Sequence, residues 1–260
     1  MTGLQQPYPI LEFDPAPEAV IEPRRHVAAI DAPRHCVICF FQEVINQIVR
    51  THNGRVIKED RWEDAVHVLY EIDLGGKRLA LMHPGVGGPI AAGLLEWTIA
   101  LGCRTFIACG GAGVLDRAIS VGHLIVPTAA VRDEGTSYHY LPPGRDVAAN
   151  PAGVAAIEAT LQAHHVPYLL GKTWTTDAPY RETTGKVQLR KSEGCLAVEM
   201  EAASFFAVAQ FRGVTLAQIL YGGDDVSSEE WDTRDWVNHD VRGRLFYLAA
   251  EACLSMQEGK

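Results

Sequence analysis

Glu199, Met200 and Glu201 are the residues whose types and spacing are best suited to chemistry. A short apolar run precedes them at residues 195–198, and an apolar segment with helical spacing follows at residues 205–209. This pattern predicts a buried strand that turns directly into a helix, with both carboxylates at the junction. Ligands of open α/β sheets bind just beyond the carboxyl ends of strands, which makes the pair a candidate site. Alternatively, both glutamates are solvated residues of the helix's first turn, where the helix dipole favours acids.

Two glycine-rich loops also follow apolar runs, at residues 85–89 and 110–113. Glycines let backbone amides approach a ligand closely, and a helix N-terminus adds positive potential for an anion. The first loop has neither the lysine of a Walker loop nor the third glycine of a dinucleotide fingerprint. Tight turns between strand and helix are therefore the alternative interpretation of both loops.

A third loop places Asp224 and Asp225 directly after an apolar run. A carboxyl group in a partly dry crevice near other acids can have a raised pKa and serve as a general acid. The alternative is a helix-capping cluster, because Ser227, Ser228 and Asp232 lie nearby.

The composition is that of an ordinary soluble globular protein, with 260 residues, 47% hydrophobic and 21% charged. The formal charge of −9 argues against nucleic acid and anionic membranes as partners, since both require a basic face. No apolar stretch is long enough to span a bilayer, and the N-terminus does not resemble a signal peptide. The six cysteines lie mostly in apolar runs, so we expect them to be reduced core residues of a cytoplasmic protein. No grouping of His, Cys, Asp and Glu residues has metal-site spacing, so we expect no metal.

Strands and helices alternate along the chain. Short apolar or alternating runs predict strands at residues 36–41, 66–72, 78–82, 104–109, 121–127, 168–175, 195–198 and 215–221. Helical spacing predicts helices at residues 43–50 and 90–101, after Asn150, after Glu201 and from Asp232 or Thr233 to the C-terminus. Residues 1–33, rich in proline, predict an arm that packs on the body or on a neighbouring subunit, and residues 34–260 predict one α/β domain.

Residues 198–202 (Val-Glu-Met-Glu-Ala) resemble the ribose-binding motif of the nucleoside phosphorylase and nucleosidase superfamily. The relevant branch contains uridine phosphorylase, hexameric purine nucleoside phosphorylase and methylthioadenosine nucleosidase, and the resemblance runs from about Cys36 to the C-terminus. It implies a single-domain, three-layer αβα fold with a central mixed, mostly parallel sheet. It assigns Met200 to packing under the sugar, Glu201 to accepting hydrogen bonds from ribose hydroxyls, and Glu199 to a supporting role.

The glycine loops carry the resemblance further. Residues 85–89, with Gly87, resemble the family's glycine loop beside the phosphate or water site. Residues 109–113, with Gly110 and Gly111, resemble the glycine turn that lines the same pocket.

The base end of the site is implied by three further segments. Residues 121–126 and 131–135, the latter including Arg132, are close to the uridine phosphorylase pattern. Tyr180 lies where the family places its base-contacting loop, and Asp224 where purine-cleaving members carry an aspartate that protonates N7 of the base.

The chain departs from the phosphorylases where they bind phosphate. Their Gly-Asp-Pro-x-Arg segment reads Phe-Phe-Gln-Glu-Val at residues 40–44, and their second glycine turn has an arginine and a serine where Ala108 and Gly111 stand here. Phosphate would then depend on Arg132, or on an arginine of a partner's N-terminal arm, Arg24 or Arg25.

The segment around Glu43 resembles instead the acidic segment of nucleosidases, in which a glutamate activates water. From the resemblance we therefore expect a homo-oligomeric pentosyltransferase, a dimer or a hexamer built from dimers, that needs no cofactor and uses phosphate as co-substrate. Met200 and Glu201 would hold the ribose and Asp224 would protonate a purine or pyrimidine base. Hydrolysis by activated water with Glu43 as base is the alternative, and a non-catalytic nucleoside-binding protein is the second alternative.

Overall fold

The computed structural model describes residues 4–236 and 239–257. Within them, one sheet contains the strands β1 (His35–Cys39), β2 (Arg55–Arg61), β3 (Val66–Asp73), β4 (Arg78–Met82), β5 (Thr105–Val114), β6 (Leu124–Asp133), β7 (Asp146–Ala148), β8 (Tyr168–Thr176), β9 (Cys195–Glu199) and β10 (Thr215–Asp225). The helices are α1 (Pro23–His26), α2 (Gln42–Thr51), α3 (Gly88–Leu101), α4 (Pro151–Ala163), α5 (Thr184–Ser192), α6 (Ala202–Arg212) and α7 (His239–Ser255). Three short 3₁₀ helices are η1 (Pro9–Leu11), η2 (Thr136–His139) and η3 (Pro179–Arg181).

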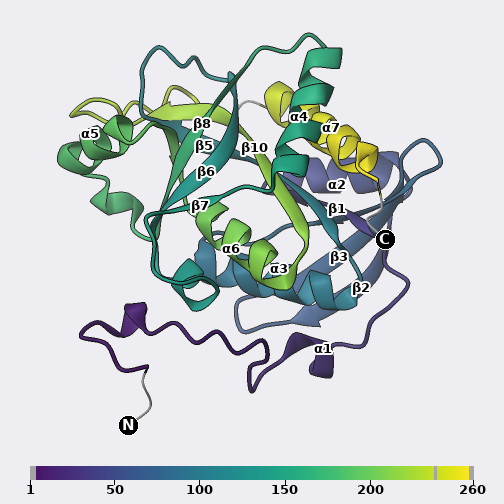
Figure 1. Ribbon diagram of the computed structural model, residues 1–260. Helices are drawn as coiled ribbons and strands as arrows, with labels where there is room; N and C mark the ends of the chain where they lie inside the picture. The colour runs from purple at the N-terminus through teal and green to yellow at the C-terminus, as the bar shows by residue number, and fades with distance from the viewer. Residues whose placement is uncertain (1–3, 237–238, 258–260) are drawn as a thin grey trace.

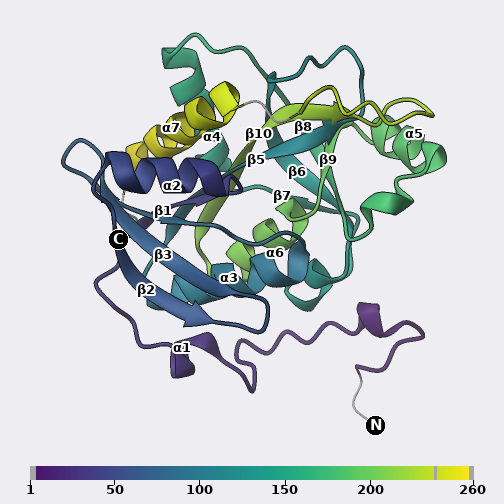
Figure 2. The ribbon, with the colours of Figure 1, turned by 180° about the vertical axis from the view of Figure 1, so that it is seen from behind.

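The sheet is partly closed on itself. Its order is β10-β6-β8-β9-β5-β1-β4-β3-β2, with β7 beside β6, and β10 also pairs with β5. The strands β5, β10, β6, β8 and β9 therefore form a ring, from which β1, β4, β3 and β2 extend as an open edge (Figures 1 and 2). Parallel and antiparallel pairings are equally represented, five of each.

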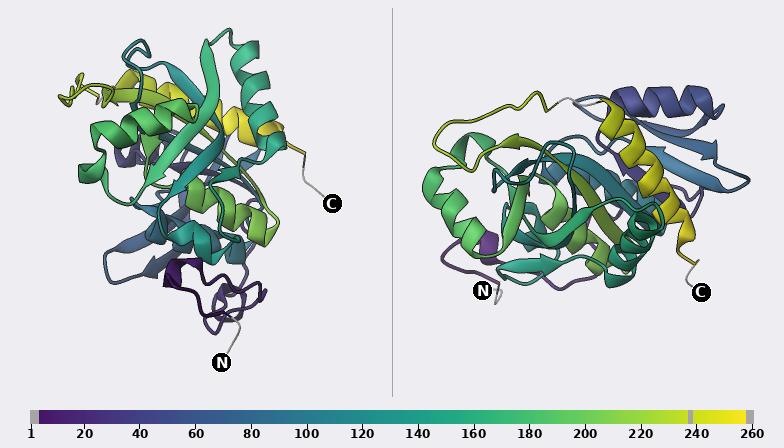
Figure 3. Two further views of the ribbon diagram at one scale, coloured as in Figure 1. Left: turned by 60° about the vertical axis from the view of Figure 1, so that its left-hand side comes forward. Right: turned by 90° about the horizontal axis from the view of Figure 1, so that it is seen from above.

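Helices cover the sheet on two sides. The helices α2, α4 and α7 lie on one side and α3 and α6 on the other (Figures 1 and 3), with a separate apolar cluster beneath each group. This arrangement confirms the expected layered α/β fold with a mixed central sheet. The sheet is not mostly parallel as expected, because half of its pairings are antiparallel.

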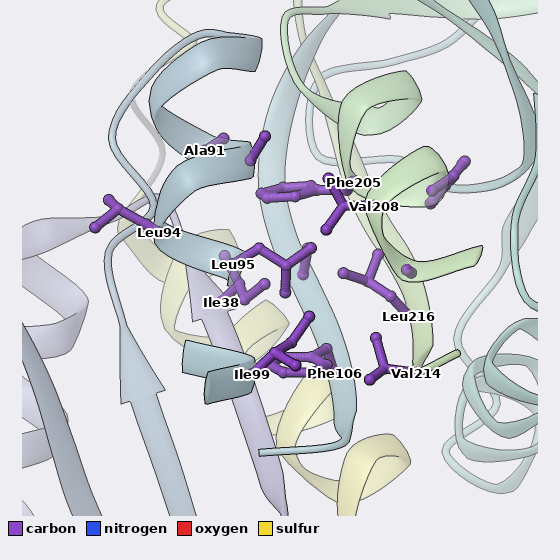
Figure 4. Packing of buried hydrophobic residues seen from close by; sticks show 14 of the residues in the cluster. Ile38, Ala91, Leu94, Leu95, Ile99, Phe106, Phe205, Val208, Val214 and Leu216 are labelled. Atoms are coloured by element: carbon purple, nitrogen blue, oxygen red, sulfur yellow. The ribbon is translucent and has the colours of Figure 1, made fainter. Parts of the chain in front are cut away.

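The packing around α3 and α6 explains why these two helices lie in the core of the protein. Apolar residues surround α3 on nearly all sides, which is typical of a helix buried in the core rather than of an amphipathic surface helix. In Figure 4, Ile99 of α3 lies beside Phe106 of β5, Phe205 lies beside Val208 of α6, and Leu95 of α3 lies between these two pairs in the same cluster. This packing holds the start of α6, and with it the carboxylates that precede it.

Several local predictions are confirmed. The strands β3 and β4 form an antiparallel hairpin, and β9 runs into α6 through the Glu199–Glu201 junction. Asn150 caps α4, since its side chain accepts hydrogen bonds from the amides of Ala152 and Gly153.

Other segments were predicted wrongly. The charged strand β2 was missed because it is an exposed edge strand whose β structure comes from pairing with β3. The helix α5 was also not predicted, although the Thr183 hydroxyl accepts from the Lys186 amide at the start of this helix. The C-terminal helix does not begin at Asp232 or Thr233: Asp232 forms a backbone bridge with Asp225, and α7 begins at His239.

The arm contains only the short elements η1 and α1 and runs along the α3 side of the molecule (Figure 3). The backbone amide of Ile30 donates to Leu101, and Glu22 forms an ion pair with Arg212 at 3.1 Å. The division into arm and domain remains a prediction. Across residues 4–236 and 239–257, no helix combines the length and apolar character that a membrane crossing requires.

Candidate active site

A cavity of about 910 Å³ lies where β5, β9 and β10 end. The segment from η3 into α5 and the loop that follows β10 form its outer wall, and Figure 2 shows these two segments beside each other. The lining is rich in carboxylates: Glu182, Glu199, Glu201, Asp224 and Glu229. Of the predicted site residues, it contains Met200, Glu199, Glu201, Gly111, Tyr180 and Asp224.

The two glutamates of the β9–α6 junction have different roles. One Glu199 carboxylate oxygen accepts from the amides of Glu201 (2.7 Å) and Ala202 (2.6 Å), and the other accepts from the Thr175 hydroxyl at 2.6 Å. Glu199 therefore binds the N-terminal amides of α6. It does so from a buried position at the end of β9, and not as the solvated first-turn residue of the alternative interpretation. The Glu201 carboxylate instead accepts from the Gly87 amide at 2.5 Å, across 114 positions of sequence.

Burial sets the electrostatics of this pair. Burial raises the pKa of Glu201 to about 8, and the neighbouring charge of Glu199 adds to the increase. Burial also raises the pKa of Glu199, although the hydrogen bonds to its carboxylate favour the ionised form and act in the opposite direction. This increase favours the protonated form of Glu201 at neutral pH, and hydrogen-bond donors from a ligand would favour its carboxylate.

The glycine loop that contains Gly87 is tied to the strand ends. Gly85 and Gly87 adopt positive φ angles of 73° and 97°. The His83 ring accepts from the Gly85 amide (3.0 Å) and lies 3.1 Å from the Phe40 carbonyl, so the nitrogen facing Phe40 carries the proton. Burial lowers the pKa of His83 and keeps this ring neutral. The loop thus positions Glu201, and Gly87 itself lies behind that side chain rather than on the cavity surface.

The structure distinguishes the two aspartates after β10. Asp224 lines the cavity, and its carboxylate accepts from the Trp231 indole at 2.7 Å. Asp225 is buried, and its carboxylate accepts from the Ser227 amide at 2.8 Å inside the turn. Asp224 is therefore available to a ligand, whereas Asp225 stabilises the turn.

Arg242 of α7 is the only arginine or lysine among the described residues that line the cavity. Its guanidinium donates to the Tyr221 hydroxyl at 3.2 Å and to the Glu43 carboxylate at 2.5 Å. It lies 4.7 Å from the centre of the ring of Phe41, the residue that precedes α2. Arg242 thus places a positive charge next to residues 40–44, the segment in which an arginine of the family pattern is missing.

Besides Gly87, three further predicted residues do not line the cavity. The buried Arg132 guanidinium donates to the Ser137 hydroxyl and to the carbonyls of Leu141 and Pro142, so it stabilises the loop after β6 and does not line the cavity. Glu43 does not line the cavity but forms an ion pair with Arg242, which does. The Glu43 side chain is partly exposed to solvent. Gly110 packs under Phe40 and, unlike Gly111, does not face the cavity.

Arg24 and Arg25 lie in α1 on the arm, outside the lining of this chain's cavity. Arg25 forms an ion pair with Glu18 of the same arm. Whether a partner's arm contributes an arginine stays a prediction.

The sequence reasoning missed Arg242, Glu182, Gln218 and the two tryptophans Trp231 and Trp236, all of which line the cavity. None of them belongs to a recognised motif, although Glu182 is only two residues from Tyr180, and none carries a local pattern that sets it apart. Only Gln218 offered a signal, because it is a polar residue within an apolar strand. It is buried, and its amide oxygen has no hydrogen-bond partner among the described residues. Those residues also contain no cluster of three or more His, Cys, Asp and Glu side chains suited to a metal ion.

Together, the fold and the site define an α/β protein whose partly closed mixed sheet holds an acidic cavity at its strand ends. The model of the phosphorylase superfamily matches residues 34–252, so the chain belongs to that family.

Guanosine phosphorylase of Halorubrum lacusprofundi is 32% identical over 171 residues, which are 64% of this chain and 68% of that protein. Uridine phosphorylase of Haemophilus influenzae is 25% identical over 160 residues, 56% of this chain and 64% of that protein. The match thus covers somewhat less than two thirds of the second relative's length.

A solved structure agrees with the fold. Uridine phosphorylase from Vibrio fischeri superposes with a TM-score of 0.75 at 24% identity, over 88% of this chain and 95% of that one. The resemblance inferred from residues 198–202 is confirmed at the level of family and fold.

Proposed function

We propose that the protein is a nucleoside phosphorylase, a pentosyltransferase that cleaves the N-glycosidic bond of a nucleoside with phosphate to give the free base and ribose 1-phosphate. One observation carries this proposal: a single cavity holds Met200 and Glu201 from the β9–α6 junction together with Asp224 from the end of β10. Relatives described as guanosine and uridine phosphorylases support the same reaction.

The geometry suits the charges that develop in this reaction. Breaking the bond builds positive charge on the sugar and negative charge on the base. Glu201, ionised when ribose hydroxyls donate to it, stabilises the sugar, and the Gly87 amide keeps its carboxylate in place. Asp224, which lines the same cavity, protonates the departing base.

Arg242 supplies the positive charge that phosphate needs. The loop arginines of the family pattern are absent, and the Arg132 guanidinium is committed to its own loop. Arg242 lies on the cavity wall beside Phe41, held by Tyr221 and Glu43. A guanidinium fixed in this way binds phosphate through its remaining donors.

Hydrolysis is the second candidate function, and the acidity of the cavity favours it. Five carboxylates and one arginine line the cavity, which disfavours a phosphate dianion. Glu43 at the start of α2 would then act as the base that activates water, with Arg242 orienting it.

Phosphate dependence separates these functions. We expect the purified chain to release base from at least one nucleoside at a rate that rises at least about 100-fold when phosphate is added, because the nucleophile is then present. The measurement is base release from a panel of purine and pyrimidine nucleosides with and without phosphate, with ribose 1-phosphate quantified as product. Equal release without phosphate would support hydrolysis, and tight binding without any turnover would support a nucleoside-binding protein.

Arg242→Gln tests the proposed phosphate site. We expect the KM for phosphate to rise about tenfold or more, with a smaller change in the KM for nucleoside, because the substitution removes the charge but keeps hydrogen-bonding capacity. Arg104→Gln is the matched control, since Arg104 does not line the cavity. An unchanged phosphate KM in the Arg242 variant would mean that another group binds phosphate.

We also propose that the enzyme is a cytoplasmic homo-oligomer. All six cysteines are buried and unpaired, as expected for a reducing compartment. The arm exposes the apolar side chains of Tyr8, Val20 and Ile21, which a second copy could cover. Light scattering that gave only the 28.4 kDa monomer would contradict the oligomer.

A further inference from the structure

Gln218 is a polar residue to which the proposed reaction has so far given no role. It lies within the apolar strand β10, is only 1% exposed and lines the cavity at the strand ends. Its amide oxygen has no hydrogen-bond partner among residues 4–236 and 239–257. A buried acceptor without a donor costs more stability than a typical hydrogen bond contributes. Because the side chain belongs to the cavity wall, a ligand can supply the missing donor.

The strand register places Gln218 beside a position that has lost a charged side chain. Gln218 pairs with Ala108 of β5, and Ala108 stands where the phosphorylases carry an arginine. Paired residues of neighbouring parallel strands lie about 5 Å apart and point to the same face of the sheet. The Gln218 amide therefore lies beside the space that the arginine would use, but it carries no charge.

A second replacement of the same kind lies three residues further along β10. Tyr221 pairs with Gly111, which stands where the phosphorylases carry a serine. A Cβ atom on Gly111 would lie 3.2 Å from the Tyr221 hydroxyl, to which Arg242 donates at 3.2 Å. Two polar side chains of β10 thus stand beside the two positions of β5 that have lost theirs.

An amide differs from an arginine in the anions that it can recognise. A guanidinium only donates hydrogen bonds, whereas a primary amide has a carbonyl acceptor beside its N–H donors. Hydrogenphosphate matches both groups, because its P–OH donates to the amide oxygen while a neighbouring phosphate oxygen accepts from the amide nitrogen. Rotation of the amide about its terminal bond is soft enough to present both atoms. Sulfate has no proton to donate at neutral pH and would leave the Gln218 oxygen unpaired.

We infer that Gln218 is a specificity-determining residue that binds hydrogenphosphate through both amide atoms and discriminates against tetrahedral anions without a proton. The inference rests on the proposed function and specifies how its co-substrate is selected. Arg242 supplies the positive charge that any oxyanion needs, whereas Gln218 recognises the proton. Arsenate, which is protonated like phosphate, fits the same amide.

Calorimetric titration of the purified chain with phosphate, arsenate and sulfate at pH 8 tests the inference, because all three anions are then mainly dianions. We expect phosphate and arsenate to bind about tenfold or more tightly than sulfate. Gln218→Met keeps the length of the side chain but removes the amide, so phosphate and arsenate should weaken to the level of sulfate. In Arg242→Gln all three affinities should fall together, because the lost charge serves every anion.

Thermal unfolding separates recognition from a structural role. Gln218→Met should not lower the Tm of the ligand-free chain, since an apolar side chain of similar size replaces an unpaired buried amide. The rise in Tm that phosphate produces should become smaller in this variant, as its affinity falls. Gln188→Met is the matched control, because Gln188 is exposed on α5 and does not line the cavity.

A phosphate-to-sulfate affinity ratio that is unchanged in Gln218→Met would overturn the inference, and so would equal affinities for the two anions in the parent chain. In both cases phosphate-dependent base release would still support the proposed function. Base release that is independent of phosphate would overturn the proposed function and, with it, the role of Gln218 in selecting the co-substrate.

Discussion

Glu201→Ala is expected to lower kcat/KM for nucleoside phosphorolysis by at least about 100-fold, because it removes the charged acceptor beneath the sugar. The loss should be large with ribonucleosides and smaller with substrates that lack a ribose hydroxyl, since fewer donors are left unpaired. Steady-state kinetics on ribo- and deoxyribonucleosides measures the difference. Glu59→Gln, on the exposed strand β2, is the control. An equal loss on both sugar types would contradict a role in hydroxyl recognition.

The same residue makes a prediction about stability and pH. Folding raises the pKa of Glu201 from 4.5 to about 8, so the native state binds more protons than the unfolded state between these values. The stabilising contribution is therefore complete at low pH and is lost as pH rises toward 8. Glu201→Gln keeps an acceptor for the Gly87 amide but cannot ionise, so its Tm should fall less between pH 5 and pH 8.5 than that of the parent chain. Parallel Tm curves for the two proteins would show that Glu201 is not protonated in the fold.

Asp224→Asn is expected to lower kcat by about 100-fold or more for a purine nucleoside, because the amide cannot protonate the leaving base. The substitution keeps an oxygen acceptor for the Trp231 indole, so the loop after β10 should remain folded. Pre-steady-state measurement of base release isolates the chemical step from product release.

A substrate that needs no protonation provides the internal control for Asp224. In 7-methylguanosine, N7 is already alkylated and positively charged, so its base leaves without a proton. The Asn variant should cleave it at a rate within about fivefold of the parent chain, as expected when general acid catalysis is the missing step. An equal loss on both substrates would assign Asp224 to positioning rather than to proton transfer.

The sequence predicted the β9–α6 junction well, because the signal there is local. A buried apolar run, two acids and a helical apolar segment follow one another within about 15 residues, and each element forms largely for its own reasons. The hairpin of β3 and β4 and the Asn150 cap are equally local and were equally predictable. The charged strand β2 was not, because only its pairing with β3 makes it a strand.

The resemblance carried by residues 198–202 implies a ribose-binding role for Glu201 and a supporting role for Glu199, whereas spacing alone left the two glutamates equivalent. Hydrogen bonds separate them: Glu199 binds the first amides of α6, and Glu201 binds the Gly87 amide. The second contact joins residues 114 positions apart. No spacing rule within one segment can reveal such a contact.

The sequence by itself determined the α/β class, the strand–helix junction with its two acids, and the loops that end the strands. Only the tertiary structure decided which charged groups share the cavity: Arg242 of α7 and Glu182 line it together with Asp224, and Arg132 is turned into its own loop. The physical reason is that local sequence sets backbone conformation and apolar burial within an element. The energy of a charge depends instead on the groups that the closed sheet brings close to it.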